Sequence, residues 1–381
     1  MRVNMGKLKL MTIVGTRPEI IRLSACIKAA DDYFEHVLVH TGQNWDYTLN
    51  QVFFEDLELR EPDYYLDSVG SHLGETMGNI IGKSYEVLEK EKPDALLVLG
   101  DTNSALSAIS AKRLKVPIFH MEAGNRCWDW NVPEMINRKI VDHIADINLP
   151  YTENSRRYLL SEGIDGKTIF VTGSPMTEVL SAYREKIDGS DVLSRLGLEE
   201  EKYILVSAHR EENIDNEDNF LSLMNGINHM AKTYDVPVIY STHPRSQKFI
   251  ELREFKFHPL VRNVKPFGFL DYNKLQMSAL CVLSDSGTLS EESAILDFPG
   301  VLIRTSTERP EALDGGTVVV GGITERDIEQ SAALAIEMHR NGAKGILPKD
   351  YEDINVSTKV IKVIQSYTHI VNKNVWFKAE S

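Results

Sequence analysis

The chain has 381 residues, of which 42% are hydrophobic and 26% are charged. This composition is ordinary for a globular protein, and the length favours two domains over one. Asp and Glu number 56 against 42 Lys and Arg, giving a formal net charge of −14. Because such an acidic surface repels phosphate backbones and anionic lipids, nucleic-acid or membrane binding is excluded as the main function.

The three cysteines, Cys26, Cys127 and Cys281, lie far apart in the sequence. They form neither a disulfide framework nor a cysteine-rich metal site, which is typical of a reducing compartment. The first apolar run, residues 8–14, is too short to span a bilayer and ends in Gly-Thr-Arg-Pro-Glu instead of a cleavage site. We therefore expect a soluble, cytoplasmic protein.

Short apolar runs alternate with amphipathic stretches along the chain. Runs of this kind, without polar alternation, are typical of strands buried on both faces of a parallel sheet. The expected strands are Lys9–Val14, His36–His40, Ala95–Leu99, Pro117–His120, Ile147–Pro150, Ile169–Thr172, Tyr203–Ser207, Val236–Tyr240, Cys281–Ser284, Val301–Ile303 and Thr317–Val320. Amphipathic stretches such as Pro18–Ala30, Leu73–Glu89 and Asn137–His143 supply the helical crossovers between them.

The two series of strands predict an α/β protein with two Rossmann-like, doubly wound domains and a cleft between them. We expect the first domain over residues 1–175, completed by a C-terminal helix and tail at 365–381, and the second over residues 185–360. In such sheets, ligands bind at the carboxyl ends of the strands. The segments that follow the strands are therefore where functional residues are expected.

The first strand ends in Gly15-Thr16-Arg17-Pro18-Glu19. Pro18 suits the first turn of a helix, whose free N–H groups can bind an anion, with Arg17 and Arg22 nearby. A simple turn with solvated arginines is the alternative. The Gly-x-Gly-x-x-Gly fingerprint of dinucleotide-binding proteins is absent here, which argues against a nicotinamide cofactor.

Three carboxylates follow strands or open a helix in the first half. Asp101 follows a strongly apolar strand, Glu122 follows the next and is expected to share a face with His120, and Glu134 precedes a helix. Asp101 could instead be a helix N-cap, and Glu134 could complement the positive end of its helix. If the three converge, they form an acid/base set in which crowding raises at least one pKa.

The second half has polar segments suited to an anion. His209 and His243 follow successive strands, and each is next to an arginine, which favours a phosphate pocket. The spacing of the histidines does not suit a metal site. The turn Ser284–Gly287 opens a helix and can cradle a diphosphate through its N–H groups, while Glu291 or Glu292 could accept hydrogen bonds from a ribose.

These motifs resemble those of the non-hydrolysing UDP-N-acetylglucosamine 2-epimerases. The matching residues run in family order over nearly the whole chain: Gly15–Glu19, Gly100–Thr102, Glu122–Gly124, Pro133-Glu134, Asn137-Arg138, His209-Arg210, Glu212-Asn213, Ser284–Gly287, Glu291-Glu292 and Thr307–Glu311. The resemblance implies two Rossmann-like domains arranged as in GT-B glycosyltransferases and a UDP-N-acetyl amino sugar as substrate. It also implies a homodimer and no metal or other cofactor.

The resemblance further implies that the proton on sugar carbon 2 is removed while UDP leaves carbon 1. UDP then re-adds to the resulting 2-acetamidoglycal, with protonation from the other face. Asp101, Glu122 and Glu134 would be the acid/base residues, with His209 near the departing diphosphate. The residues implied in binding UDP are Arg17, Arg22, His243, Ser286, Gly287 and Arg309 around the phosphates, Glu292 at the ribose, and Tyr272 on the uracil, where the family usually has Phe.

The segment after Glu122–Gly124 departs from the common Leu-Arg-Thr pattern. It reads Asn-Arg-Cys-Trp-Asp-Trp-Asn over residues 125–131, and Met135 replaces the usual second Glu. This variant resembles the capsule and O-antigen branch, which converts UDP-2-acetamido-2,6-dideoxy-L-talose to UDP-N-acetyl-L-fucosamine. The alternatives are conversion of UDP-GlcNAc to UDP-ManNAc, a hydrolysing epimerase, a GT-B glycosyltransferase, and a non-catalytic UDP-sugar-binding protein.

Overall fold

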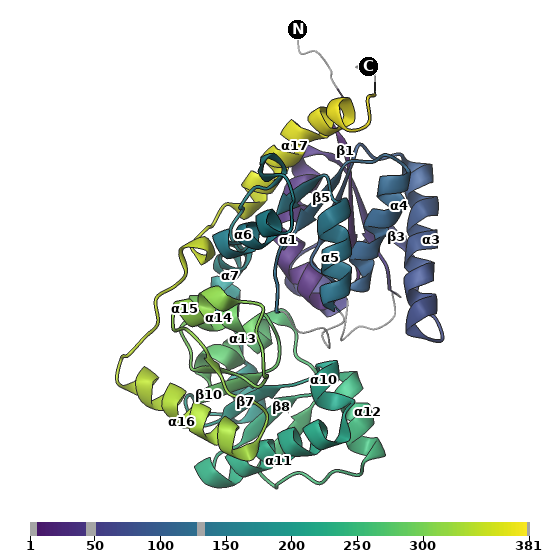
Figure 1. Ribbon diagram of the computed structural model, residues 1–381. Coiled ribbons are helices and arrows are strands. Elements are labelled where there is room, and N and C mark those ends of the chain that lie inside the picture. The colour runs from purple at the N-terminus through teal and green to yellow at the C-terminus, as the bar shows by residue number, and fades with distance from the viewer. Residues whose placement is uncertain (1–5, 43–50, 128–133, 379–381) are drawn as a thin grey trace. The chain divides into compact units, whose positions relative to one another are not determined.

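The computed structural model describes residues 6–42, 51–127 and 134–378 of the chain. Contacts divide the chain into two compact units (Figure 1). Unit 1 consists of Met1–Ala182 together with Glu352–Ser381, and unit 2 consists of Tyr183–Tyr351. Each unit contains one six-stranded sheet whose paired strands all run parallel.

Unit 1 has the strand order β3-β2-β1-β4-β5-β6. Its strands are β1 (Lys9–Val14), β2 (Glu35–His40), β3 (Tyr64–Tyr65), β4 (Ala95–Leu99), β5 (Ile118–Met121) and β6 (Ile147–Leu149). Its helices are α1 (Arg17–Tyr33), α2 (Val52–Asp56), α3 (Leu73–Glu91), α4 (Ser107–Arg113), α5 (Glu134–Ile144), α6 (Glu153–Ser161), α7 (Met176–Ala182) and α17 (Val356–Asn374). Met11 and Ile13 of β1 pack with Ala108 and Ala111 of α4 in one buried cluster.

Unit 2 has the strand order β12-β11-β10-β7-β8-β9. Its strands are β7 (Ile204–Ser207), β8 (Val238–Ser241), β9 (Val261–Val264), β10 (Cys281–Ser284), β11 (Gly300–Leu302) and β12 (Val319–Val320). Its helices are α8 (Arg184–Asp188), α9 (Val192–Leu196), α10 (Glu211–Ile214), α11 (Glu217–Tyr234), α12 (Pro244–Leu252), α13 (Phe269–Ser278), α14 (Leu289–Leu296), α15 (Pro310–Asp314) and α16 (Glu325–Arg340). Ile204 and Leu205 of β7 belong to different buried clusters, because successive strand residues face opposite sides of the sheet.

Both units therefore have the doubly wound topology predicted from the alternating pattern. The strand order changes direction between β1 and β4 in unit 1 and between β7 and β10 in unit 2. Ligands of open α/β sheets bind at such a switch point, outside the carboxyl ends of the strands. Asp101 follows β4 and His209 follows β7, so each unit presents candidate residues at its own switch point.

The strand pattern differs from the prediction in three places. Ile169–Thr172 does not form a strand, because only Ile169 makes a bridge, to Asn148. The edge strands β3 and β9 were not predicted. β3 has two residues, and the middle residues of β9, Arg262 and Asn263, are exposed, so neither segment reads as a continuous apolar run.

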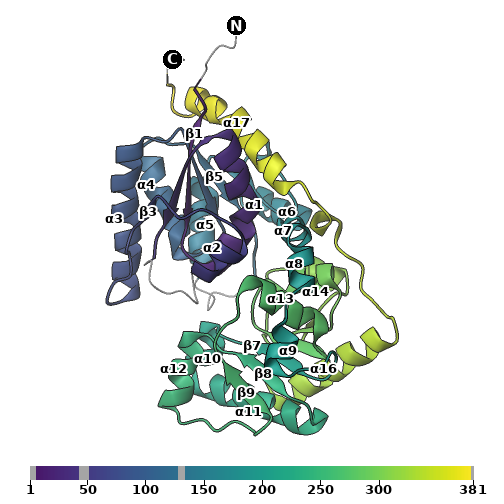
Figure 2. The ribbon, with the colours of Figure 1, turned by 180° about the vertical axis from the view of Figure 1, so that it is seen from behind.

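The chain returns to unit 1 through α17, which contacts α1 in both views (Figures 1 and 2). The rings of Phe170 and Tyr367 lie 4.7 Å apart, joining this helix to the segment after β6. After α17, the ring centroid of Trp376 lies 5.1 Å from the ammonium of Lys112 on α4. The side chain of Phe377 is exposed. None of the helices in the described ranges is long and apolar enough to cross a membrane.

His40 ends β2 and is completely buried. Its Nδ1 accepts a hydrogen bond from the backbone N–H of Gly42 at 3.1 Å, so Nε2 carries the ring proton. The ring lies against Phe54 and Tyr65, with centroids 6.4 Å and 5.7 Å away. Burial lowers the pKa of His40 to about 4, because the charged ring would lose its hydration.

We expect the lowered pKa of His40 to make unit 1 sensitive to mild acid. At pH values between the pKa of His40 in the unfolded chain and its lower pKa in the folded protein, the unfolded chain carries more of the proton. The free energy of unfolding therefore falls as the pH falls through this range. The contribution of this one group is about 2 kcal/mol between pH 7 and pH 5. His40→Asn retains an acceptor for Gly42 and should show a smaller difference between urea denaturation curves at the two pH values. An unchanged difference in this variant would rule out His40 as the source.

Candidate functional site

The turn after β5 has an uncommon backbone conformation. Glu122 has a φ of 59°, in the left-handed region, and Gly124 follows with a φ of 81°. Such a φ is rare for a residue with a side chain and is kept only where its surroundings enforce it. Because Glu122 lies beyond the last strand residue, the alternation that predicted a shared face with His120 does not extend to it.

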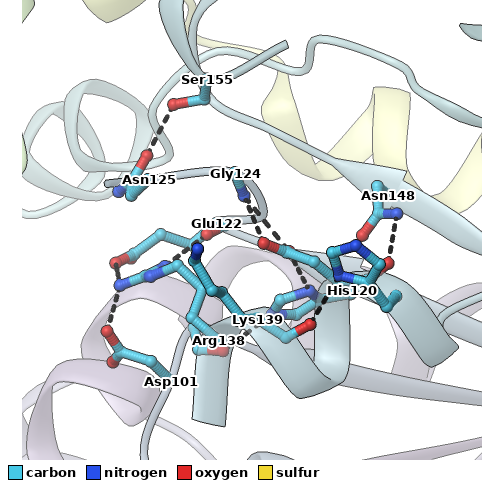
Figure 3. Close-up of polar contacts among 12 residues, drawn as sticks. Asp101, His120, Glu122, Gly124, Asn125, Arg138, Lys139, Asn148 and Ser155 are labelled. Atoms are coloured by element: carbon cyan, nitrogen blue, oxygen red, sulfur yellow. Dashed lines mark hydrogen bonds and ion pairs between the residues drawn. The ribbon is translucent and has the colours of Figure 1, made fainter. Parts of the chain in front are cut away.

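Arg138 of α5 joins the two strand-end carboxylates of unit 1 (Figure 3). Its Nη2 donates to the carboxylate of Asp101 and lies 3.3 Å from Oε1 of Glu122, while its Nη1 donates to the Glu122 carbonyl at 2.5 Å. Arg138 is completely buried and the Asp101 side chain is 16% exposed. The structure thus brings Asp101 and Glu122 together around one guanidinium, and Asp101 is not an N-cap.

Arg22 of α1 forms a second ion pair with Glu122. Its guanidinium also lies 5.9 Å from the centroid of the Tyr151 ring. Arg22 is buried. This predicted phosphate ligand thus already has a carboxylate partner, Glu122, within unit 1. Arg17 is less buried, and its guanidinium lies 5.7 Å from the ring centroid of Phe53.

The loop from Asp101 to Ser104 is fixed by Glu19 and Asn137. Glu19 accepts hydrogen bonds from the Gly15 N–H at 3.1 Å and from the hydroxyls of Thr16 and Ser104. Burial of Glu19 raises the pKa of its carboxyl, and these hydrogen bonds oppose the rise. From the other side, Asn137 Nδ2 donates to the Asp101 carbonyl at 3.0 Å. The ends of β1 and β4 are therefore tied together.

Glu134 is the first residue of α5, four residues before Arg138, and its side chain is half-buried. This position complements the positive end of the helix. The next residue, Met135, is buried. The distinctive loop residues 128–133, including Trp128 and Trp130, lie outside the described residues.

In unit 2, Asp285 at the end of β10 fixes the segment after β7. Its carboxylate accepts the N–H groups of His209 at 2.9 Å and Arg210 at 2.8 Å and the side-chain amide of Asn213 at 3.1 Å. Burial raises the pKa of Asp285, and these donors together with the charge of Arg210 oppose the rise. His209 Nδ1 lies 3.5 Å from this carboxylate, so Asp285 orients both the backbone and the ring of His209.

The predicted phosphate ligands of unit 2 gather near His209. Its ring centroid lies 5.3 Å from that of His243, which caps α12. The Ser286 hydroxyl lies 3.0 Å from that of Thr288 at the start of α14. A Cβ added to Gly287 would lie 3.0 Å from the Glu308 carboxylate, so glycine permits a close approach there.

Of the remaining predicted UDP ligands in unit 2, Glu292 and Arg309 are buried and Tyr272 is not. Glu292 of α14 is buried and accepts a hydrogen bond from Gln276 Nε2 at 2.6 Å. Arg309 is 1% exposed, and its Nη2 lies 3.3 Å from Glu291. Tyr272 of α13 is half-buried and packs against the apolar cluster of that side of the sheet.

Sequence reasoning gave no role to three residues that organise these groups: Glu19, Arg138 and Asp285. Arg138 and Glu19 stand within motifs used for the family resemblance, but their partners lie in other elements and spacing does not reveal them. Asp285 stands within the Ser284–Gly287 turn, for which the sequence predicts a diphosphate-binding role through backbone N–H groups and not through this carboxylate. Among the described residues, no group of three or more His, Cys, Asp or Glu side chains could hold a metal ion.

Comparison with known proteins gives a consistent family assignment. A family model described as UDP-N-acetylglucosamine 2-epimerase matches residues 27–365. The structure of UDP-N-acetylglucosamine 2-epimerase from Rickettsia bellii superposes with a TM-score of 0.91 at 47% identity, covering 98% of this chain and 100% of that one.

Two further relatives bear on the sugar. The crystal structure of the Methanocaldococcus jannaschii UDP-GlcNAc 2-epimerase in complex with UDP-GlcNAc and UDP has a TM-score of 0.88 at 31% identity, covering 94% of this chain and all of that chain. The UDP-2,3-diacetamido-2,3-dideoxy-D-glucuronate 2-epimerase of Pseudomonas aeruginosa is 33% identical over 335 residues, which are 86% of this chain and 92% of the relative. Similar chains are thus named for different UDP sugars.

The turn from Glu122 to Gly124 can be tested without any assay of activity. A Cβ at position 124 would lie 2.5 Å from the carbonyl oxygen of Ser155. The backbone φ of 81° at this position is also unfavourable for a residue with a side chain. We expect Gly124→Ala to lower the free energy of unfolding by about 3 kcal/mol, from backbone strain and overpacking together. The matched control is Gly163→Ala, with a φ of 87° and nothing within 4 Å, which should cost about 1 kcal/mol. Equal losses in urea denaturation would contradict the steric argument.

Proposed function

The chain belongs to the UDP-N-acetylglucosamine 2-epimerase family and is an isomerase that acts on UDP sugars, and we propose that it inverts carbon 2 of a UDP-2-acetamido sugar through elimination and re-addition of UDP. The observation that carries this mechanism is the pairing of Asp101 and Glu122 around Arg138. Two carboxylates at neighbouring strand ends can act as base and acid on the same carbon, provided that a cation allows both to be buried.

In the proposed elimination, one carboxylate of the acid/base set removes the proton from carbon 2. The electron pair of the C2–H bond forms a double bond to carbon 1 while the C1–O bond breaks, and its electron pair leaves with the β-phosphate of UDP. The product is a 2-acetamidoglycal with UDP still bound. Re-addition of UDP to carbon 1 and protonation of carbon 2 from the opposite face complete the inversion, so protons and electrons balance.

A proton on a carbon without an adjacent carbonyl is weakly acidic, so departure of UDP must contribute to the reaction. We propose that unit 2 supplies this help. His209, held by Asp285, would donate to the leaving diphosphate, and Ser286 and Gly287 would offer backbone N–H groups to its oxygens. Arg17 and Arg22 from unit 1, and His243 and Arg309 from unit 2, would supply further positive charge or hydrogen bonds, and Tyr272 would stack on the uracil.

For the sugar, we propose UDP-2-acetamido-2,6-dideoxy-L-talose, with UDP-N-acetyl-L-fucosamine as the product in capsule or O-antigen synthesis. The support is the sequence from Asn125 to Asn131 and Met135 in place of the family's second Glu. The buried Met135 leaves one carboxylate fewer at the start of α5. UDP-GlcNAc is the second candidate, favoured by the 47% identity to a chain bearing that epimerase name.

The function is tested by incubating the enzyme with each UDP sugar in D2O and recording proton NMR spectra. We expect deuterium at carbon 2 of a sugar that remains attached to UDP, because the abstracted proton exchanges with solvent before it returns. The faster sugar identifies the substrate. Loss of UDP without re-addition would indicate hydrolysis, and no exchange with either sugar would indicate a transferase or a binding protein.

The acid/base roles are tested by Asp101→Asn and Glu134→Gln. Each variant keeps the side-chain shape but loses the basic carboxylate, so we expect turnover to fall by about 10³-fold or more. Affinity for UDP, measured by calorimetry, should stay within about threefold of wild type because the carboxylates act on the sugar. A variant that retains turnover would remove that residue from the acid/base set.

The proposed ribose contact is tested by Glu292→Ala. Loss of a charged hydrogen-bond acceptor should weaken UDP binding by about 10-fold to 100-fold. Glu292→Gln, which keeps an acceptor oxygen, should lose less. The comparison requires that both variants keep the melting temperature of the wild type, because Glu292 also accepts a hydrogen bond from Gln276 within the fold. Unchanged calorimetric affinity in Glu292→Ala would refute the ribose role.

A further inference from the structure

His120 ends β5 and its side chain is completely buried, as is that of Asp142 on α5. His120 Nε2 lies 2.7 Å from the carbonyl oxygen of Gly100, and because a carbonyl only accepts, Nε2 donates this hydrogen bond. On the other side of the ring, Nδ1 lies 3.0 Å from Oδ1 of Asp142. The ring of His120 therefore lies between α5 and the end of the neighbouring strand β4.

The two backbone groups held in this way adjoin the two carboxylates. Gly100 immediately precedes Asp101, and its φ of 69° sets the direction in which the chain leaves β4. Asp142 also accepts the backbone N–H of Gly124 at 3.2 Å, two residues after Glu122. One buried pair thus constrains the backbone on which both carboxylates stand.

The charge balance keeps Asp142 available for these contacts. Burial alone would raise the pKa of Asp142, but its close contact with His120 and the charges of Arg126 and Arg138 hold that pKa below the ordinary value. Arg126 Nη2 lies 2.8 Å from Asp142 and is itself paired with Glu162 at 2.7 Å. The carboxylate of Asp142 is therefore ionised, and its ion pair with Arg126 stabilises the charge.

We propose that His120 and Asp142 are positioning residues that set the direction of the Asp101 and Glu122 carboxylates through Gly100 and Gly124. Arg138, one helical turn before Asp142 on α5, contacts the carboxylates themselves, whereas His120 and Asp142 hold the backbone beneath them. This inference rests on the proposed roles of Asp101 and Glu122. It predicts a loss in kcat with little change in substrate binding, because a displaced base slows proton transfer more than it weakens contacts with UDP.

The test uses Asp142→Asn, whose carboxylate contacts the last part of β5, with a matched control that contacts the first residue of β5. Asp146 is also buried, accepts the backbone N–H of Ile118 at 2.9 Å and pairs with Lys112 at 2.6 Å. Asp146→Asn should therefore cost stability without moving the carboxylates. We expect Asp142→Asn to lower kcat by about 10-fold to 100-fold with KM within about threefold, and Asp146→Asn to leave both unchanged per folded molecule.

Two substitutions of His120 separate its contacts. In His120→Gln the amide nitrogen can reach the position of Nε2 and keep the bond to Gly100, whereas His120→Asn is too short to do so. Greater residual kcat in His120→Gln supports anchoring through Gly100, and the reverse order would overturn it. Equal kcat losses in Asp142→Asn and Asp146→Asn would reduce the pair to a general stabilising role.

If Asp142→Asn does not fold, Asp142→Glu keeps the charge but displaces the carboxylate, and an unchanged kcat in that variant would also overturn the proposal. Deuterium exchange by the wild-type enzyme is measured in the same assay. No exchange in wild type contradicts the proposed function, whereas exchange at equal rates in wild type and Asp142→Asn contradicts only the positioning role.

Discussion

Two carboxylates at neighbouring strand ends can be buried together only if a cation lies with them, and in unit 1 that cation is Arg138. An isolated buried carboxylate loses its hydration and would take up a proton, so it would no longer be basic. Arg138 contacts both Asp101 and Glu122, and Arg22 contacts Glu122 from α1. The position of α5 against the sheet is therefore as important to the site as the strand ends.

Backbone conformation carries much of the remaining precision in unit 1. The chain leaves β4 and β5 through residues in the left-handed region, Gly100 and Glu122, so the extended conformation of each strand ends there. Hydrogen bonds from Asn137, and contacts of Asp142 with the backbone of Gly124, hold these segments from α5. Strained backbone at a functional site is retained only where the surroundings determine it, and here one helix provides most of those surroundings.

Unit 2 has the same sheet topology but uses its switch point differently. A single buried carboxylate, Asp285, accepts two successive backbone N–H groups and thereby sets the start of α10. Around it lie histidines, hydroxyls and a glycine that permits close approach, which suits an anion better than proton transfer from carbon. The same fold thus presents candidate acid/base residues in one unit and candidate phosphate ligands in the other.

The sequence by itself determined the doubly wound class, the bounds of strands such as β1, β4 and β10, and the polar residues that follow them. These features are local, since apolar runs and strand-end glycines are visible in any short window. The tertiary structure alone decided which groups meet: Arg138 lies 16 residues from Glu122 and 37 from Asp101, and Asp285 lies 76 residues from His209. Such pairings depend on how helices pack against the sheet and on buried partners from other elements, and no spacing along the chain encodes them.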